Sequence, residues 1–340
     1  MWKYILKRIG LAIVTAFIIL SLTFILIALL PPDKMPGEPA QRVAYYDGQV
    51  RLGYMYRTEE DLGIESVDTV RVGDIAYYYY QVPIMQRYGS WLGNIMRGDW
   101  GVSQRIKPNV AATEIIGERI VVSMRINIIS VVISVPLGIG LGIWAAVKKN
   151  TVTDHIISTL VMIFISLPSF VLITFLMLML CYQNPILPST WPTPSADADT
   201  KALAYILPVF CLSLGSICGY CRFTRAELCE VMESEYLLLA RTKGLTRRQA
   251  IMRHALKNSM VPIFPSILSE FIGILGGSMI LEKLYAIPGI GSLFIDSIQY
   301  KDYNVLFVDM ALFTTIGLIA GVFLDISYSL IDPRIRMGER

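Results

Sequence analysis

The sequence predicts an all-α polytopic membrane protein with six transmembrane helices. Its composition and the clustering of its apolar residues both point to this class. Hydrophobic residues make up 54% of the 340-residue chain and charged residues only 17%, against about 25% charged residues in soluble domains. The mean hydropathy is +0.54. This composition excludes a disordered chain, a small disulfide-stabilised protein and an ordinary cytosolic enzyme. A net charge of +3 does not indicate a nucleic-acid-binding protein.

The apolar residues gather in six runs, each close to the roughly 20 residues that a helix needs to cross a bilayer core. The first, third and sixth runs are the clearest, the fourth is short, and the second and fifth contain glycine, proline and one charge each. The runs are Ile9–Leu30, Ile120–Val147, Ile156–Tyr182, Leu203–Tyr220, Val261–Leu281 and Val305–Ile331. Six crossings return the chain to the side on which it started.

Positive charge is concentrated in alternate connecting segments. The basic positions are Lys3, Lys7, Arg8, Lys148, Lys149, the stretch 222–257, Arg334, Arg336 and Arg340. The segments 31–119, 183–202 and 282–303 are net negative. Because basic loops stay in the cytoplasm, we expect a multi-pass protein of the cell (inner) membrane with both termini cytoplasmic. The first run is too long for a signal peptide and no A-x-A site precedes Pro31, so we expect it to be retained.

These segments divide the chain into parts with different surroundings. The parts are 1–30 (cytoplasmic end and first span), 31–119 (extracytoplasmic segment), 120–331 (five-span core with a cytoplasmic loop at 227–260) and 332–340 (cytoplasmic tail). In the second part, Tyr77–Tyr80, Trp91 and Trp100 favour anchoring at the membrane interface over direct ligand contact. The apolar spacing of 81–97 favours a helix on the membrane surface.

The sequence carries no pattern of an enzyme active site. No G-x-x-x-x-G-K-[ST] occurs, so the chain has no phosphate loop of its own, and we expect it to bind no cofactor or metal. An intramembrane aspartyl protease needs two carboxylates at one water. Asp309 and Asp325 lie on one expected helix, about 24 Å apart along its axis. The serine type needs a histidine inside the bilayer, and both histidines lie outside the apolar runs.

Small residues inside the runs favour helix packing. Gly138, Gly140 and Gly142 have a spacing typical of close helix contact rather than of nucleotide binding. Cys218 and Cys221 form a C-x-x-C pattern, but it falls at the inner end of an expected membrane helix. A zinc site needs about four ligands, and the two histidines, His155 and His254, lie on other cytoplasmic loops. We therefore expect both groups to serve packing.

The cytoplasmic stretch between the fourth and fifth runs has strong local signals. Glu230–Thr242 has helical composition, with acids early and bases late, as the helix dipole prefers. Gly244 stands where a C′ glycine would end that helix. Thr246 and Gln249 form a capping box for a second helix, which we expect to end at Pro262.

Two short helices joined at a glycine corner suggest a binding element. A basic helix-turn-helix can bind DNA, but membrane spans on both sides would hold this one at the bilayer. Contact of the basic side chains with anionic lipid is an alternative. A preformed knob that inserts into a soluble protein explains the caps together with the apolar face formed by Ile251, Met252, Ala255 and Leu256.

Ordered motifs along nearly the whole chain resemble the inner-membrane permeases of binding-protein-dependent ABC importers, specifically the oligopeptide/dipeptide branch. The segments that carry the resemblance are the first 40 residues, 91–103, 235–262, 284–298, 301–303 and 332–336. The sequence departs from the family in two motifs. Leu238 and Leu239 replace the Glu-Ala of the general permease loop, and Ile287 replaces a common tryptophan.

The resemblance implies the fold of type I ABC importer permeases and one half of a heterodimeric pore for peptides. A homologous second permease, two cytoplasmic ATPases that hold ATP and Mg²⁺, an extracytoplasmic substrate-binding protein and membrane lipid would be its partners, with no nucleic acid. The chain itself would be non-catalytic. The residues that would couple to the ATPases are Ala240, Arg241, Gly244, Leu245, Thr246 and Arg248.

Other substrates and another transporter class stay open. Relatives move nickel, glutathione or oligosaccharides, and a self-contained secondary transporter is the main rival, although internal repeats are not evident. Arg125 and Glu270 are charges inside apolar runs, where insertion costs about 2.5–3.5 kcal/mol. One interpretation is structural: the two residues form an ion pair, or Arg125 reaches the outer headgroups. The other interpretation is that they line the translocation path.

Overall fold

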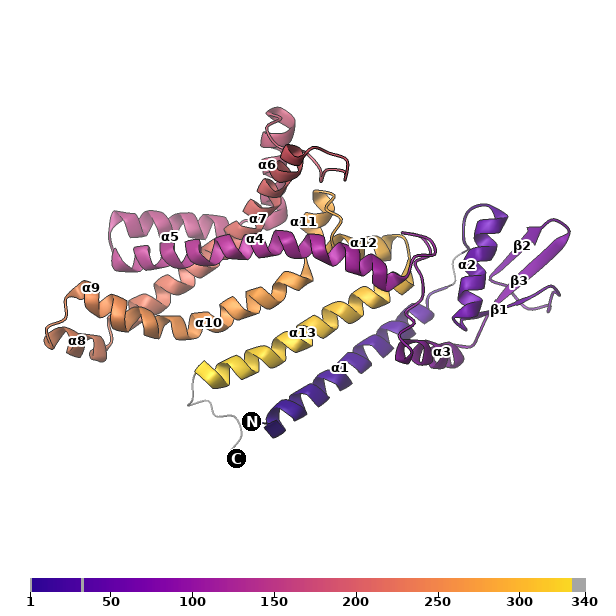
Figure 1. The fold of residues 1–340 in the computed structure, drawn as a ribbon, viewed down its shortest axis with the longest axis horizontal. Helices are drawn as coiled ribbons and strands as arrows, with labels where there is room; N and C mark the ends of the chain where they lie inside the picture. Colours follow the sequence, from indigo (N-terminus) through magenta and orange to yellow (C-terminus); the bar gives the residue numbers. More distant parts are fainter. Residues whose placement is uncertain (1, 32–33, 332–340) are drawn as a thin grey trace. The chain divides into compact units, whose positions relative to one another are not determined.

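The protein is mostly helical, and its computed structural model describes residues 2–31 and 34–331. The tail 332–340, with its predicted cytoplasmic arginines, lies outside the described residues. Figure 1 labels the helices and strands along the chain, which forms two compact units. The larger unit contains 119–293 with the two helical ends of the chain, up to residue 9 and from residue 316. The smaller unit contains 10–118 and 294–315.

Within residues 2–31 and 34–331, four helices are long and apolar enough to cross a membrane. They are α1 (Trp2–Ala28), α4 (Ala112–Val147), α7 (Ala198–Met232) and α13 (Tyr303–Ile331). These helices contain most of the first, second, fourth and sixth apolar runs. The short fourth run is the centre of a helix of 35 residues, so run length underestimated the helix.

The third run forms a bent pair rather than one straight helix. Helix α5 (Val152–Ile165) is followed by α6 (Ser169–Met177) and a π-helical end, η1 (Leu178–Gln183), at an angle of 91°. The bend falls at Pro168, which caps α6. Proline has no N–H to donate and disfavours the α conformation in the residue before it. Counted as one span, the pair makes five candidates.

The fifth run is also interrupted. Helix α10 (Leu256–Gly273) is followed by a short 3-10 turn, η3 (Ile274–Gly276), and by α11 (Met279–Leu284). Gly277 separates them with φ of +63°, a conformation that ends a regular helix. Helix α10 is not among the candidate spans of the described residues, and six spans therefore stays a prediction.

The remaining helices are short. They are α2 (Pro39–Arg51), α3 (Ile84–Met96), α8 (Glu235–Thr242), α9 (Arg247–Ala250), η2 (Ile251–Ala255, a π-helical turn) and α12 (Ile290–Gln299). Helix α3 lies within the segment 81–97, where a helix was expected. No helix or strand occurs between Asn184 and Asp197.

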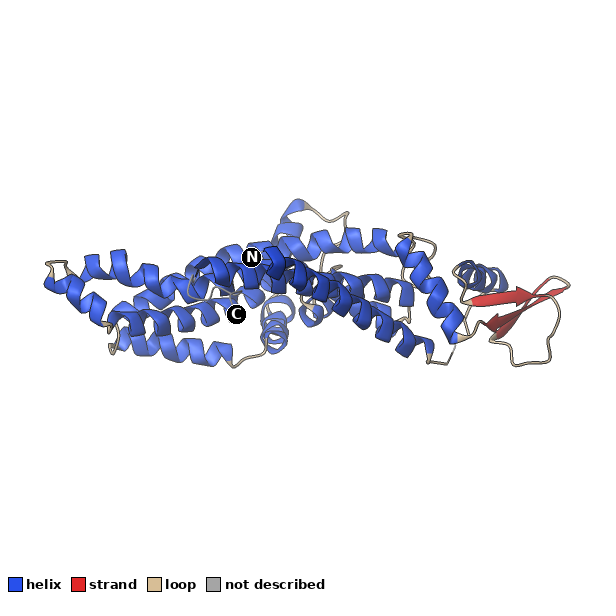
Figure 2. Ribbon diagram, turned by 90° about the horizontal axis from the view of Figure 1, so that it is seen from below, coloured by secondary structure: helices blue, strands red, loops and turns tan. Residues whose placement is uncertain are grey.

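The smaller unit contains a three-stranded antiparallel sheet, so the strict all-α prediction is wrong there. Strands β1 (Met55–Thr58), β2 (Asp68–Val72) and β3 (Ile75–Gln81) pair in the order β1-β3-β2, and α2 packs against β1 and β2 (Figure 2). The β2–β3 hairpin turns at Gly73, whose φ of +61° suits a tight hairpin turn.

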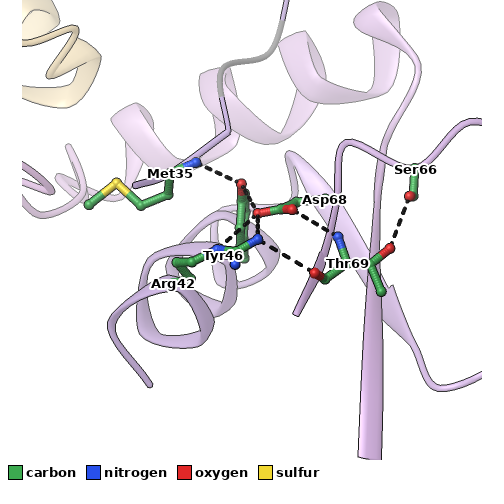
Figure 3. A network of polar contacts seen from close by, with 6 residues as sticks. All are labelled: Met35, Arg42, Tyr46, Ser66, Asp68 and Thr69. Atoms are coloured by element: carbon green, nitrogen blue, oxygen red, sulfur yellow. Dashed lines mark hydrogen bonds and ion pairs between the residues drawn. The ribbon is translucent and has the colours of Figure 1, made fainter. Parts of the chain in front are cut away.

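A buried carboxylate joins α2 to the sheet (Figure 3). The side chain of Asp68 is 4% exposed and accepts hydrogen bonds from Arg42 Nη2 at 2.5 Å and from the Tyr46 hydroxyl at 2.8 Å. The Tyr46 hydroxyl also accepts from the backbone N–H of Met35 at 3.0 Å. A buried charge needs such partners, and together they fix the helix on the sheet.

The aromatic residues of this unit form cores rather than the expected interface anchors. Tyr79 and Tyr80 on β3 are 0% and 1% exposed. Trp91 on α3 packs against Phe24 of α1 and Phe307 of α13, with ring centroids 4.9 and 5.9 Å apart. The anchoring prediction is wrong for these three residues because aromatic rings suit both packed sheets and interfaces.

Glycines of α4 allow close contact with α7, as predicted for two of the three. A Cβ at Gly138 would lie 2.8 Å from the carbonyl oxygen of Ile217, and one at Gly142 would lie 2.7 Å from that of Cys221. A Cβ at Gly140 would have no neighbour within 4 Å among the residues that the structure describes. The contact therefore uses every fourth residue, which returns to one helix face.

We predict that Gly142→Ala destabilises the chain by about 1–3 kcal/mol, because the backbone of α7 has no room for the methyl group. Gly140→Ala is the matched control on the same helix. It should be neutral or stabilising by up to about 1 kcal/mol, because alanine favours helix. Thermal unfolding of the purified chain in detergent measures both, and equal midpoints would contradict the packing role.

Candidate functional site

The predicted glycine corner is present between α8 and α9. Gly244 has φ of +94°, and no atom of the described residues lies within 4 Å of where its Cβ would be. Glycine is therefore needed there for its backbone conformation rather than for space. The capping box is complete: Gln249 N–H donates to Thr246 Oγ1 at 3.3 Å, and Thr246 N–H donates to Gln249 Oε1 at 3.1 Å.

We call the segment Glu235–Ala255, which contains α8, the corner, α9 and η2, the hairpin. The chain on both sides of it differs from the prediction. The expected helix Glu230–Thr242 is divided, because α7 continues to Met232 and α8 begins at Glu235. Pro262 is not a boundary: it lies inside α10, which joins α9 and η2 in a helical run to Gly273. The hairpin is therefore continuous with long helices, with one short break at Glu233–Ser234.

The apolar face of the hairpin is largely used within the chain. Ile251 and Ala255 are buried in a cluster with Ala146 of α4 and Leu228 of α7. The prediction that this face inserts into a partner is wrong for these two residues. Met252 stays 57% exposed.

The outer side of the hairpin is exposed, apolar on α8 and basic around the corner. Leu238 and Leu239 are 63% and 56% exposed. The structure brings together all the residues predicted to couple to a partner: Ala240 and Leu245 are half-buried, and Arg241, Gly244, Thr246 and Arg248 are exposed. This surface can contact another protein through apolar side chains ringed by positive charge.

Polar contacts hold the base of the hairpin. Lys149, just after α4, forms an ion pair with Glu233 in the break before α8. The hydrogen bond with Glu233 raises the pKa of Lys149. Arg247 Nη2 donates to the carbonyl oxygen of Val147 at 3.5 Å, where the last carbonyls of α4 lack helical partners. These contacts tie both arms of the hairpin to the end of α4.

The two predicted path residues are not paired with each other. Arg125 is exposed on α4 and Glu270 is half-buried on α10, and no ion pair joins them in the described part of the chain. The hydroxyl of Tyr220 on α7 lies beside the Glu270 carboxylate and 3.2 Å from the carbonyl oxygen of Ser266. The structural-pair interpretation therefore has no support from this arrangement.

Asp325, another charge within an apolar run, does have an ion pair. Its carboxylate lies 3.1 Å from Arg8 Nε near the start of α1. A second pair, between Asp154 of α5 and Arg225 of α7, is bidentate at 2.6 and 2.8 Å, and the Asp154 side chain is 1% exposed. Bidentate geometry fixes the two helices in both position and orientation.

Sequence reasoning missed Glu282, the carboxylate around which several segments gather. It is 3% exposed and accepts hydrogen bonds from Ser123 Oγ at 2.7 Å and from the backbone N–H groups of Ser292 and Ser278 at 3.0 and 3.2 Å. Ser123 Oγ in turn accepts from the N–H of Ile290 at 2.9 Å. One side chain therefore connects α4, α11 and α12.

Three glycines mark this carboxylate in the sequence. A Cβ at Gly277 would lie 2.8 Å from Glu282 Oε1 and one at Gly291 would lie 3.0 Å from Oε2, and a Cβ at Gly289 would overlap the same carboxylate. The signal for this site in the sequence is an acidic residue in an apolar stretch with glycines on both sides. This signal does not identify the groups that donate hydrogen bonds to the carboxylate.

Comparison with known proteins gives consistent relatives. Residues 138–337 match the family described as binding-protein-dependent transport system inner membrane component. The dipeptide transport system permease protein DppB of Lactococcus lactis is 32% identical over 99% of this chain and 100% of its own length. The oligopeptide transport system permease protein OppB of Escherichia coli is 31% identical over 99% of this chain and 100% of its own length. A chain of the inward-facing MetNI methionine ABC transporter has a TM-score of 0.46 at 15% identity, covering 67% of this chain and 98% of that one.

We predict that Glu282→Gln destabilises the chain by about 1–3 kcal/mol, because an amide nitrogen cannot accept the hydrogen bonds that one carboxylate oxygen accepts. Glu233→Gln, at the exposed ion pair with Lys149, is the control and should cost no more than about 1 kcal/mol. Thermal unfolding in detergent separates them. Equal losses would show that Glu282 is no more important than a surface acid.

Proposed function

The chain belongs to the family of binding-protein-dependent transport system inner membrane components, and we propose that it is the permease subunit of an ATP-driven importer of peptides. The observation that carries the proposal is the alignment over the full length of permeases named for dipeptides and oligopeptides. The protein is a multi-pass membrane protein, and its proposed substrate is a peptide delivered from outside the cell.

The proposed complex contains a second, homologous permease, two cytoplasmic ATPases and an extracytoplasmic substrate-binding protein. The chain itself is non-catalytic, since its sequence has no phosphate loop to hold ATP and Mg²⁺. We propose that ATP and Mg²⁺ bind to the ATPases and that this chain contributes half of the translocation pathway.

The hairpin at Gly244 is the proposed contact with an ATPase. Exposed Leu238 and Leu239 supply apolar area, and Arg241 and Arg248 supply a positive rim. Interfaces of this kind place apolar anchors inside a polar border. Because the hairpin is tied to α4, α7 and α10, closure of the ATPases would move these helices and alternate access to a central cavity.

We propose six spans with both termini in the cytoplasm, the interrupted α10–α11 segment serving as the fifth. Residues 31–119, which belong to the smaller unit, would then lie outside the cell, and the tail 332–340 would lie inside. Glu270 is proposed to line the path, with Arg125 near its outer part. A peptide carries charge at both ends, and polar groups within spans usually face a wet interior.

We predict that Gly244→Val abolishes peptide uptake and weakens co-purification of the ATPases at least tenfold, because valine strongly disfavours a positive φ. Lys243→Val is the matched control: it introduces the same side chain next door, where φ is −79°. Uptake by cells that express the whole transporter, together with pull-down of the ATPases, measures both. Normal uptake in Gly244→Val would remove the hairpin from the coupling mechanism.

The proposed topology is tested by single cysteines. Replacements of Glu59 and Thr193, both exposed, should react with a membrane-impermeant maleimide in intact cells, whereas a replacement of Arg247 should react only after lysis. The five native cysteines are all buried, which limits background labelling. Labelling of the Arg247 position from outside would reverse the proposed orientation.

A further inference from the structure

A cavity of about 100 Å³ lies within the smaller unit, several times the space that one water needs. It is bounded by the end of α1 at Ile27 and Ala28 and by the start of α13 at Tyr303. Both are ends of candidate membrane spans. The cavity therefore lies where membrane-spanning helices meet the folded segment that follows α1.

Three nitrogen atoms at this cavity lack acceptors, although the Arg105 guanidinium also contacts the Tyr45 hydroxyl. Arg87 Nε, Arg105 Nε and Gln104 Nε2 are buried, and none has a hydrogen-bond partner within the described residues. All three side chains are among the cavity's lining residues. Buried donors are nearly always paired, so three unpaired donors at one cavity need an explanation. A bound acceptor supplies one.

The charge around the cavity is positive. Arg87, Arg105 and Lys301 line it, and no aspartate or glutamate is among its lining residues. Burial lowers the pKa of Arg87, the direction expected where desolvation of a cation outweighs favourable charges nearby. Its Nη2 donates a 3.0 Å hydrogen bond to the carbonyl oxygen of Ala28, and Tyr54 lies close enough to interact with its charge.

The carboxylate of Asp302 is next in sequence to Lys301, but its contacts are directed to the loop. Its Oδ2 accepts from Ser103 Oγ at 2.6 Å and from the N–H groups of Gln104, Arg105 and Ile106 at 3.0–3.1 Å. This carboxylate shapes the loop that carries Arg105 and offsets one of the two positive charges of Arg87 and Arg105. A net positive charge remains for a ligand.

We propose that this cavity binds a phosphate group. The unpaired donors come from α3 and from the 104–105 loop, so they approach from more than one side, as a tetrahedral oxyanion requires. Guanidinium groups bind phosphate through paired N–H donors. The ligand is either the phosphate of an anionic lipid headgroup, since the cavity adjoins two span ends, or free inorganic phosphate. This site is separate from the hairpin and does not depend on the proposed transport function.

The test uses the full-length chain purified in detergent, with thermal unfolding followed as ligand is added. The probes are short-chain phosphatidylglycerol, short-chain phosphatidylcholine and inorganic phosphate. A ligand that binds only the folded state raises the unfolding midpoint with its concentration. We expect saturable stabilisation by phosphatidylglycerol or by inorganic phosphate. Stabilisation by phosphatidylglycerol alone identifies a lipid headgroup, and equal stabilisation by inorganic phosphate identifies the free ion.

Substitutions assign the binding to this cavity. Arg105→Gln should raise the dissociation constant at least tenfold, and Arg105→Lys, which keeps the charge, should raise it less. Arg71→Gln removes an equal charge from the exposed surface of β2 and should leave binding unchanged. No saturable stabilisation of the unmodified chain by any probe overturns the proposal. So does an equal effect of Arg105→Gln and Arg71→Gln, which would indicate general surface attraction.

Discussion

The buried carboxylate of Glu282 is the interaction on which the broken-helix region of the larger unit depends. Where α10 ends and α11 and α12 begin, backbone N–H groups lose their helical acceptors, and in an apolar environment each loss costs free energy. Glu282 accepts from two of these groups, at Ser278 and Ser292, and from Ser123 of α4. The surrounding glycines are required because the carboxylate occupies the space of their side chains. Irregular backbone is tolerated here because one acid satisfies it.

The two faces of the hairpin at Gly244 have different surroundings. The inner face, with Ile251 and Ala255, is buried in the cluster that includes α4 and α7, so the hairpin is held in place without a partner. The outer face leaves Leu238 and Leu239 exposed, at the proposed contact with an ATPase. A partner that binds a preordered element avoids the entropic cost of ordering it. This arrangement suits repeated binding and release during a transport cycle.

Local signals in the sequence predicted local structure well. The capping box at Thr246 and the positive φ of Gly244 each depend on neighbouring residues, and both are confirmed. Apolar runs predicted the long helices because membrane crossing requires them. The sequence did not reveal the sheet around Tyr79, because tyrosine is common in strands and at interfaces alike. It did not reveal the role of Glu282, whose partner Ser123 lies 159 residues away, since such contacts depend on tertiary packing.

The π-helical turn at Ile251–Ala255 has a consequence for the direction in which side chains point. A helix assigns each residue an angle about its axis, and a turn closed by i→i+5 hydrogen bonds holds more residues than an α turn. The turn therefore offsets the rotational phase of α10 relative to α9. Glu270 lies C-terminal to this turn. The direction in which its side chain points about the axis of α10 therefore depends partly on the five residues of the π-helical turn. If the π-helical turn converted to regular α-helix, α10 would have to rotate about its own axis relative to α9. A conformational change at the hairpin would then be transmitted to Glu270 as a rotation of its helix.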